Sequence, residues 1–88
     1  MKTYKDTEIS GKMFYRLFDE NVDESNLIWH RDKEDRSVHV VCGSGWKLQM
    51  DNELPIELLP GYDYVIPKNT FHRIFKGEKS LILRIEEQ

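Results

Sequence analysis

The sequence predicts an all-β protein. Short runs of alternating apolar and polar residues recur along the chain, and this period of two is typical of strands with one buried face. Glycine, proline, asparagine and aspartate separate these runs at short intervals, as they do in turns. No segment keeps a helical period for long enough to predict a dominant helix. Many short strands joined by turns are typical of a sandwich, a jelly roll or a small barrel.

Seven strands follow from this pattern. We expect them at residues 12–18, 26–31, 37–42, 46–50, 62–66, 70–75 and 80–85. An acidic loop at 19–25, a glycine turn at 43–45 and further turns at 51–55, 60–61 and 76–78 separate them. The short glycine turn predicts a hairpin between the two strands that flank it.

The period of two assigns the faces of these two strands. The side chains expected to point inward are Val38, Val40, Cys42, Trp46, Leu48 and Met50. Cys42 is therefore expected to be a buried structural thiol. Followed backwards, the same face enters a charged segment and carries Arg36, Glu34, Asp32 and His30. The charged residues nearest the core thus share a nominal face with a histidine.

Length and charge restrict the function. The 88 residues suffice for one domain (1–88), with an N-terminal strand and acidic loop (1–25) followed by a barrel (26–88). A net charge of -3 and a pI near 5.6 provide no general attraction to phosphate backbones, which argues against a nucleic-acid partner. A small molecule is the expected ligand.

The sequence predicts neither a secreted nor a membrane protein. Its single cysteine, Cys42, cannot form a disulfide within the chain, and its first residues lack the apolar run of a secretion signal. No stretch approaches the apolar length needed to cross a bilayer. We therefore expect a cytoplasmic protein without a membrane partner.

Gly61, Pro67, Asn69 and His72 form the most informative motif. Their order and spacing resemble the second signature of the cupin family, G-x5-P-x-G-x2-H, with asparagine in place of the second glycine. Asparagine is the non-glycine residue that best tolerates the left-handed backbone of such a turn. The resemblance implies a single cupin-type jelly-roll barrel, mainly antiparallel, similar to the very small single-domain (cupin-2-like) members.

The first cupin signature, G-x5-H-x-H-x3-4-E-x6-G, is matched only in part. His30 stands at the first histidine position and Gly43 at the closing glycine. Glu24 replaces the opening glycine, Asp32 the second histidine and Arg36 the glutamate. In the family, these histidines and the carboxylate hold a divalent metal together with the histidine of the second signature. The resemblance therefore implies that His30 and His72 are metal ligands.

Acidic residues beside His30 complete the expected metal site. Asp32 and Glu34 offer oxygen ligands, which gives a set of two histidines and carboxylate that suits iron, manganese, nickel or zinc. The other interpretation of each histidine is a hydrogen-bonded core or rim residue. The run 31–36 is wholly charged and can equally be a solvated loop.

Arg36 favours a different ligand. A permanent cation beside a divalent metal costs Coulomb energy unless an acidic neighbour pairs with it, whereas a guanidinium is a good fork for a carboxylate or phosphate. Gln49 and Arg73 could add polar contacts to such a pocket. Its candidate aromatic lining is Trp29, Trp46, Tyr62, Tyr64, Phe71 and Phe75.

Two functions stay open at this point. The first is a cupin that binds a divalent metal and a small polar molecule at the barrel mouth, as in a metal-dependent oxygenase, isomerase or lyase. The second is a non-catalytic module that binds a small anion or a sugar without metal, through Arg36 and aromatic side chains. Fold analogy alone fixes neither substrate nor activity.

We also predict a homodimer. A chain this short has strand edges to cover, and the apolar segment 13–18 is suited to join the sheet of a second copy. The cupin resemblance implies the same assembly. Light scattering at tens of micromolar should give twice the monomer mass, and a mass near 10.5 kDa would contradict the prediction.

Overall fold

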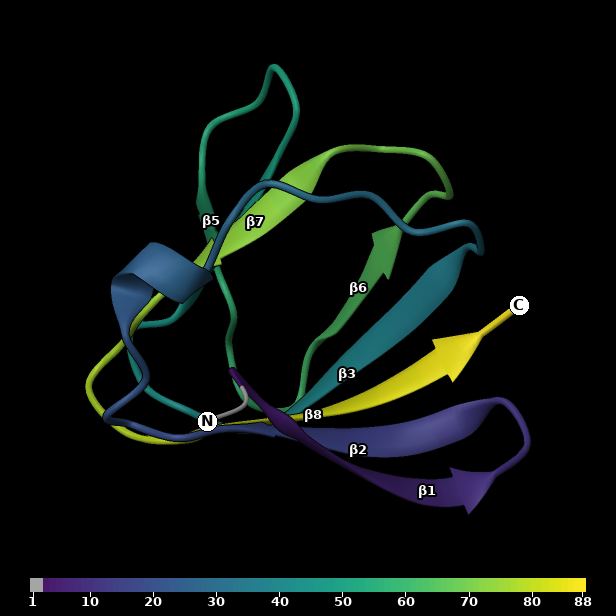
Figure 1. Ribbon diagram of the computed structural model, residues 1–88, viewed down its shortest axis with the longest axis horizontal. Coiled ribbons are helices and arrows are strands. Elements are labelled where there is room, and N and C mark those ends of the chain that lie inside the picture. Colours follow the sequence, from purple (N-terminus) through teal and green to yellow (C-terminus); the bar gives the residue numbers. More distant parts are fainter. Residues whose placement is uncertain (1–2) are drawn as a thin grey trace.

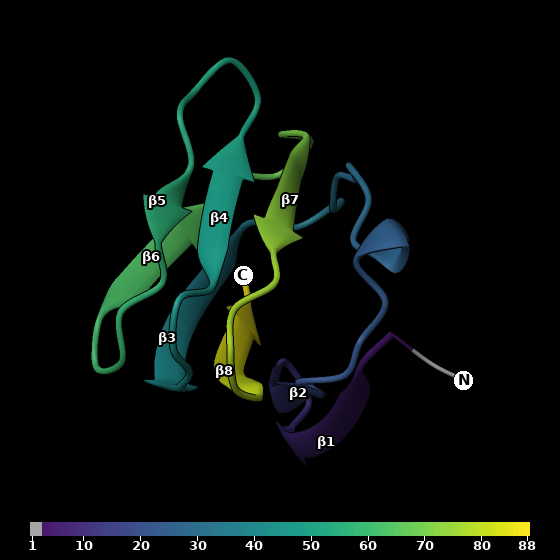
Figure 2. The same ribbon diagram turned by 90° about the vertical axis from the view of Figure 1, so that its left-hand side faces the viewer.

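The computed structural model describes residues 3–88, which form two antiparallel sheets that face each other (Figures 1 and 2). The strands are β1 (Lys5–Ser10), β2 (Met13–Phe18), β3 (Arg36–Cys42), β4 (Lys47–Met50), β5 (Ile56–Glu57), β6 (Asp63–Ile66), β7 (His72–Phe75) and β8 (Leu81–Glu87). One sheet has the order β1-β2-β8-β3-β6 and the other the order β5-β4-β7. The predicted all-β class is confirmed.

The predicted strand at 26–31 is wrong. A short 3-10 helix, η1 (Glu24–Asn26), begins after Asp23, whose side chain accepts a hydrogen bond from the Ser25 amide at 2.9 Å. Beyond it the chain forms only one isolated bridge, between His30 and His72. The local cap competes with an extended backbone, and the alternating pattern does not show this competition. Nowhere in 3–88 is there a helix of the length and apolarity that crossing a membrane requires.

The predicted hairpin around the glycine turn is also wrong. β3 pairs with β6 and β8, whereas β4 pairs with β5 and β7. The turn at 43–45 therefore carries the chain from one sheet to the other. Gly45 has a φ of 78°, a conformation that glycine adopts without steric cost. A glycine turn permits either connection, so the pairing of the sheets decides which one forms.

Cys42 is exposed rather than buried. A β-bulge interrupts the pairing of β3 with β8 between Val40 and Cys42, and a bulge shifts the inward and outward alternation by one residue. Val40 is fully buried, while Val41 is 44% exposed. The predicted inward face holds up to Val40 and ends at the bulge.

β1 was not expected from the sequence, because all six of its residues are exposed and none alternates with a buried one. It pairs with β2, which also pairs with β8. The segment Met13–Phe18 is therefore internal to its sheet, so it is not the open edge that the dimer prediction assumed. The dimer itself stays a prediction, and β1 rather than Met13–Phe18 is the edge at this end of the sheet.

The core lies between the two sheets. Trp46 and Leu48 of the three-stranded side face Val38 and Val40 of the five-stranded side, and all four are at most 3% exposed. The Trp46 indole also donates a hydrogen bond to the Lys79 carbonyl at 2.6 Å. These inward positions agree with the predicted faces. The core fills one end of the space between the sheets and leaves the other end hollow.

Gly77 provides a test of the packing at the filled end. A Cβ atom at this position would collide with the Ser44 carbonyl and would lie 2.6 Å from the Trp46 amide nitrogen. Since both neighbours are backbone atoms, Gly77→Ala should destabilise the protein by about 1–3 kcal/mol, roughly 4–8 °C in Tm for each kcal/mol. Gly11→Ala is the matched control, because no atom lies within 4 Å of its Cβ position. Equal melting temperatures of the two variants would contradict this packing.

Candidate metal centre

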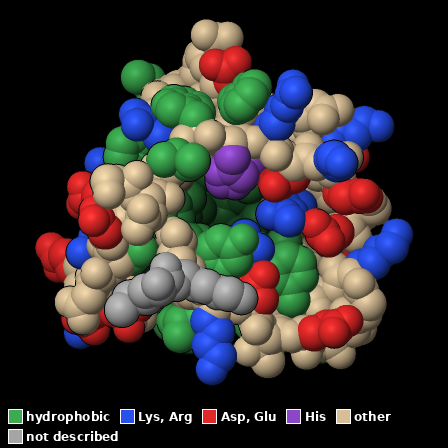
Figure 3. Space-filling view, viewed as in Figure 1, with side chains coloured by type: hydrophobic (Ala, Val, Ile, Leu, Met, Phe, Trp, Pro, Cys, Tyr) green, Lys and Arg blue, Asp and Glu red, His purple; other side chains and the backbone are tan. Residues whose placement is uncertain are grey.

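A cavity of about 330 Å³ opens between the sheets, and Figure 3 shows its mouth. Hydrophobic side chains cover its floor, while histidine, acidic and basic side chains surround the opening. The floor includes Phe18, Val38, Leu48, Leu58, Ile66 and Leu83. Five polar or charged side chains on the wall are Arg16, His30, Asp32, Arg36 and His72. A mostly apolar pocket with a few convergent polar groups is the usual form of a small-molecule site.

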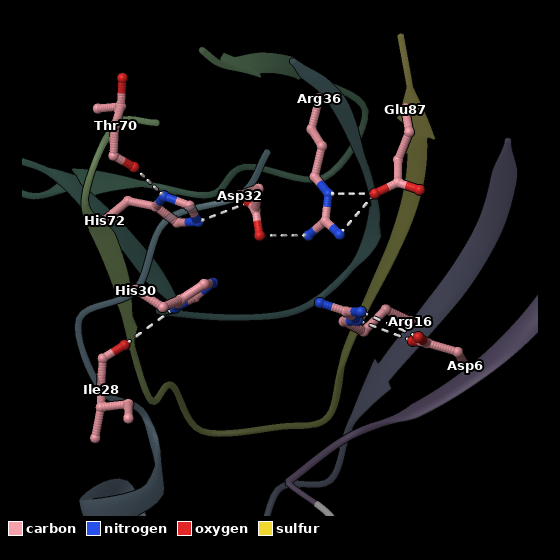
Figure 4. Close-up of polar contacts among 9 residues, drawn as sticks. All are labelled: Asp6, Arg16, Ile28, His30, Asp32, Arg36, Thr70, His72 and Glu87. Atoms are coloured by element: carbon pink, nitrogen blue, oxygen red, sulfur yellow. Dashed lines mark hydrogen bonds and ion pairs between the residues drawn. The ribbon is translucent and has the colours of Figure 1, made fainter. Parts of the chain in front are cut away.

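His72 begins β7 and is only 3% exposed. The turn before it contains Asn69 with a φ of 60°, the left-handed conformation expected at this position. The imidazole Nδ1 lies 2.8 Å from the Thr70 carbonyl, so Nδ1 carries the proton and Nε2 keeps its lone pair. Burial lowers the pKa of His72, which further favours the neutral ring. Nε2 is therefore a free ligand atom that faces the cavity (Figure 4).

His30 lies beside His72 at the exposed mouth of the cavity. The two residues exchange backbone hydrogen bonds of 3.0 and 2.8 Å, and their ring centroids are 4.3 Å apart. Nδ1 of His30 lies 3.1 Å from the Ile28 carbonyl, so this ring too offers Nε2. A hydrogen bond from the second ring nitrogen to a backbone carbonyl is the usual support of a metal-bound histidine.

Asp32 lies between His72 and Arg36 (Figure 4). Its Oδ1 pairs with Nη1 of Arg36 at 3.3 Å, and its Oδ2 is 3.4 Å from Nε2 of His72. Oδ2 is buried and has no hydrogen-bond partner among residues 3–88. Because the neutral His72 has its proton on Nδ1, two acceptors face each other with no hydrogen between them. A buried polar atom left in this way requires an explanation, such as an ion.

The donor atoms of His30, Asp32 and His72 all lie within 4.8 Å of one another. Around an ion bound at about 2.1 Å in tetrahedral geometry, ligand atoms are about 3.4 Å apart. Side-chain movements of about 1 Å would therefore bring the three atoms to one ion. Two imidazoles and one carboxylate that leave other positions open are the donor set of many catalytic metal sites, so these residues fit a divalent metal.

Arg36, at the start of β3, forms ion pairs with Asp32 and Glu87. Its Nε and Nη2 contact one oxygen of Glu87 at 3.1 and 2.8 Å, and its Nη1 contacts Asp32. The positive charge of Arg36, which from the sequence alone counted against a metal at this place, is thus offset by the carboxylate of Glu87. This partner was not expected, because Glu87 is 51 residues away in sequence and is opposite Arg36 only through the pairing of β3 with β8.

The structure does not bring Glu34, Gln49 and Arg73 to the cavity. Glu34 is exposed in a bend, which ends the period of two assumed for this segment. Gln49 and Arg73 are opposite each other on β4 and β7 and are joined by a hydrogen bond of 3.2 Å. They alternate with Leu48 and His72, which line the cavity, and so belong to the outer face.

The aromatic lining also differs from the expected one. None of the six aromatic candidates lines the cavity among the described residues, and Tyr4 and Phe18 do so instead. Arg16, on β2, was missed as well. The available signal was a charged residue at an inward position, because Arg16 lies midway between Phe14 and Phe18 on the same face of the strand.

Solved structures of cupins are similar to this chain. A cupin-2 domain containing protein from Shewanella frigidimarina matches with a TM-score of 0.68 and 21% identity, over 97% of this chain and 79% of that one. KdgF from a Halomonas species matches with a TM-score of 0.64 and 19% identity, over 97% and 77% of the two chains. A structure described under the DMSP lyases RdDddP and RnDddQII gives a TM-score of 0.74 at 17% identity.

The similarity lies in the fold. The sequence matches no protein-family model and no curated protein, and the chain spans 37% of the length of the DMSP lyase chain. Matches over nearly the whole of this chain nevertheless show that it has the fold of a small cupin-type protein. The predicted resemblance to cupins is thereby confirmed.

Asp32→Asn tests whether the Asp32 carboxylate is a metal ligand or serves mainly in the ion pair with Arg36. An asparagine could keep its oxygen toward Arg36 and place its amide NH2 group where Oδ2 now lies. The NH2 group could then donate a hydrogen bond to Nε2 of His72. The free energy of unfolding of the metal-free protein should therefore stay the same or rise by about 1 kcal/mol. Chemical denaturation measures this. A loss of more than about 1 kcal/mol would show that the Asp32 carboxylate serves the ion pair with Arg36.

Proposed function

We propose that this protein binds a divalent metal through Nε2 of His30, Nε2 of His72 and Oδ2 of Asp32, and holds a small polar molecule beside it. The observation that carries the proposal is the buried Oδ2 of Asp32, which faces an unprotonated imidazole nitrogen at 3.4 Å and has no partner in 3–88. A cation between these atoms would replace a repulsive contact by coordination.

The chemistry of the donor set supports iron, manganese, nickel or zinc. Imidazole suits all four metals, and one carboxylate adds the hard oxygen ligand that iron and manganese favour. A bound ion would supply a Lewis acid that polarises or orients an oxygen of the ligand. As an enzyme, such a protein would be an oxygenase, isomerase or lyase, and DMSP lyases are among the proteins with a similar fold.

The surrounding residues would hold this site in place. Arg36 fixes the carboxylate of Asp32 by the contact to Oδ1, which leaves Oδ2 directed at the histidines. The Thr70 and Ile28 carbonyls fix the tautomers and ring orientations of the two histidines. The apolar floor excludes water from the inner side, which strengthens electrostatic interactions within the cavity.

The alternative of an anion site built on Arg36 without metal has less support. Nε and Nη2 of this guanidinium are already bonded to Glu87, and Nη1 contacts Asp32. An incoming anion would have to displace a carboxylate from each side. The expected aromatic side chains do not line the cavity either.

Calorimetry with manganese, nickel and zinc tests the proposal on protein purified without a histidine tag. The wild-type protein should bind at least one of them stoichiometrically, and His72→Ala should lower the affinity at least about tenfold because it removes one of two imidazole ligands. His39→Ala is the matched control, since His39 lies on β3 and pairs with Asp63 at 2.7 Å outside the cavity. Negligible heats with all three metals in the wild type would refute the proposal.

A further inference from the structure

Arg16 is a second guanidinium within the cavity, placed opposite the histidines (Figure 4). Its side chain is only 11% exposed. Nε and Nη2 form a two-pronged contact with Asp6 at 2.8 and 3.0 Å. The Tyr4 ring stacks on the guanidinium, with 3.7 Å between Cζ and the ring centroid. The planar group is therefore held in one orientation from two sides.

One nitrogen of Arg16 remains available to a ligand. Nη1 makes no hydrogen bond with the residues that the structure describes, and Figure 4 shows this end of the guanidinium directed away from Asp6, across the cavity toward His30. Arg36 differs, because its nitrogens already contact Asp32 and Glu87. Of the two arginines that line the cavity, Arg16 is thus the one with a nitrogen free to bind an anion.

The balance of charge around the cavity indicates the charge of that anion. Arg16 and Arg36 are paired with three carboxylates, those of Asp6, Asp32 and Glu87, which leaves one negative charge in excess. A divalent cation on Asp32 and the histidines would turn this into one positive charge in excess. Uncompensated charge costs free energy where it is withdrawn from water, and the side chains of Arg16, Asp32 and Arg36 are at most 15% exposed. A ligand with one negative charge would make the loaded site neutral.

The shape of the cavity indicates the rest of the ligand. Its volume of about 330 Å³ lies at the lower end of the range of small-molecule pockets. The floor beneath the charged wall is apolar, with Phe18 and Leu83 among its residues. A carboxylate with a small apolar body matches both features, and a carboxylate has the geometry that guanidinium groups bind best.

We propose that the ligand of this cavity is a small organic monocarboxylate with an apolar body, and that Arg16 binds its carboxylate. This inference rests on the proposed function, because the charge balance includes the metal. Arg16 acts as a ligand-binding residue. Asp6 and Tyr4 are positioning residues that hold its guanidinium.

Benzoate and benzamide are suitable probes because they have the same shape and differ in charge. Calorimetry on zinc-loaded wild-type protein should show benzoate binding at least about tenfold more tightly than benzamide. Arg16→Gln should lower the benzoate affinity at least about tenfold. Arg84→Gln, which removes the same charge from an exposed position of β8, should leave it unchanged. An unchanged benzoate affinity in Arg16→Gln, or equal binding of the two probes, would overturn the proposal.

The two proposals can fail separately. If manganese, nickel and zinc all fail to bind, the metal site is refuted, and the same benzoate titrations are then made on the metal-free protein. Binding that depends on Arg16 would there support the carboxylate site without the argument from charge balance, and no such binding would overturn it. If both hold, benzoate should raise the zinc affinity by the factor by which zinc raises the benzoate affinity. A factor of one would overturn the argument from charge balance.

A measurement on the wild type covers the case in which Arg16→Gln does not fold. In nitrogen-15 NMR spectra of the zinc-loaded protein, benzoate should shift the Nε–H resonance of Arg16 and leave that of Arg84 unchanged. Benzamide should shift neither. No shift at Arg16 under saturating benzoate would overturn the proposal independently of any variant.

Discussion

The structure depends on the way one irregular segment, residues 27–35, is held between the two sheets. His30 exchanges two backbone hydrogen bonds with His72 on β7. Further along, the Asp32 carbonyl accepts from the Asn69 amide at 2.7 Å, and the Asp35 carbonyl accepts from the Gln88 amide at 2.9 Å. The segment forms no strand, and its path is fixed by these backbone hydrogen bonds together with side-chain contacts such as that of the Asp35 carboxylate with the Lys68 amide at 2.7 Å. They place a histidine and a carboxylate beside the histidine of β7.

The site that results does not stabilise the folded protein. A buried carboxylate oxygen without a partner costs free energy, and His72 is kept neutral by the same burial that lowers its pKa. Proteins retain such features where function requires them. Arg36 limits the cost, since it pairs with the other oxygen of Asp32 at 3.3 Å and is itself paired with Glu87 at 2.8 Å. Arg16 and Asp6 repeat this arrangement on the opposite wall.

The two proposals share one physical basis. Charges that are buried beside the apolar floor of the cavity cost free energy when they are unpaired and interact strongly when they are paired. Metal and anion would each supply the charge that the other requires, so their binding should be coupled. The coupling concerns side chains from four different parts of the chain, namely β2, the segment 27–35, β3 and the start of β7. Backbone hydrogen bonds to neighbouring strands hold each of these parts, including His30 of the irregular segment through its two bonds with His72.

The all-β class and six of the strands could be predicted from the sequence, because period two and turn spacing are local properties of the chain, and the cupin-type fold followed from the motif around His72. The sequence also singled out His30, Asp32 and His72, whose role as metal ligands stays a proposal. Only the tertiary structure decided that Glu34 turns away, that β3 and β4 belong to different sheets and that a bulge exposes Cys42. It also decided that Glu87 reaches Arg36 and that Arg16 faces the histidines. These outcomes depend on which strands pair and in which register. The local sequence pattern of a segment does not predict which distant segment it pairs with.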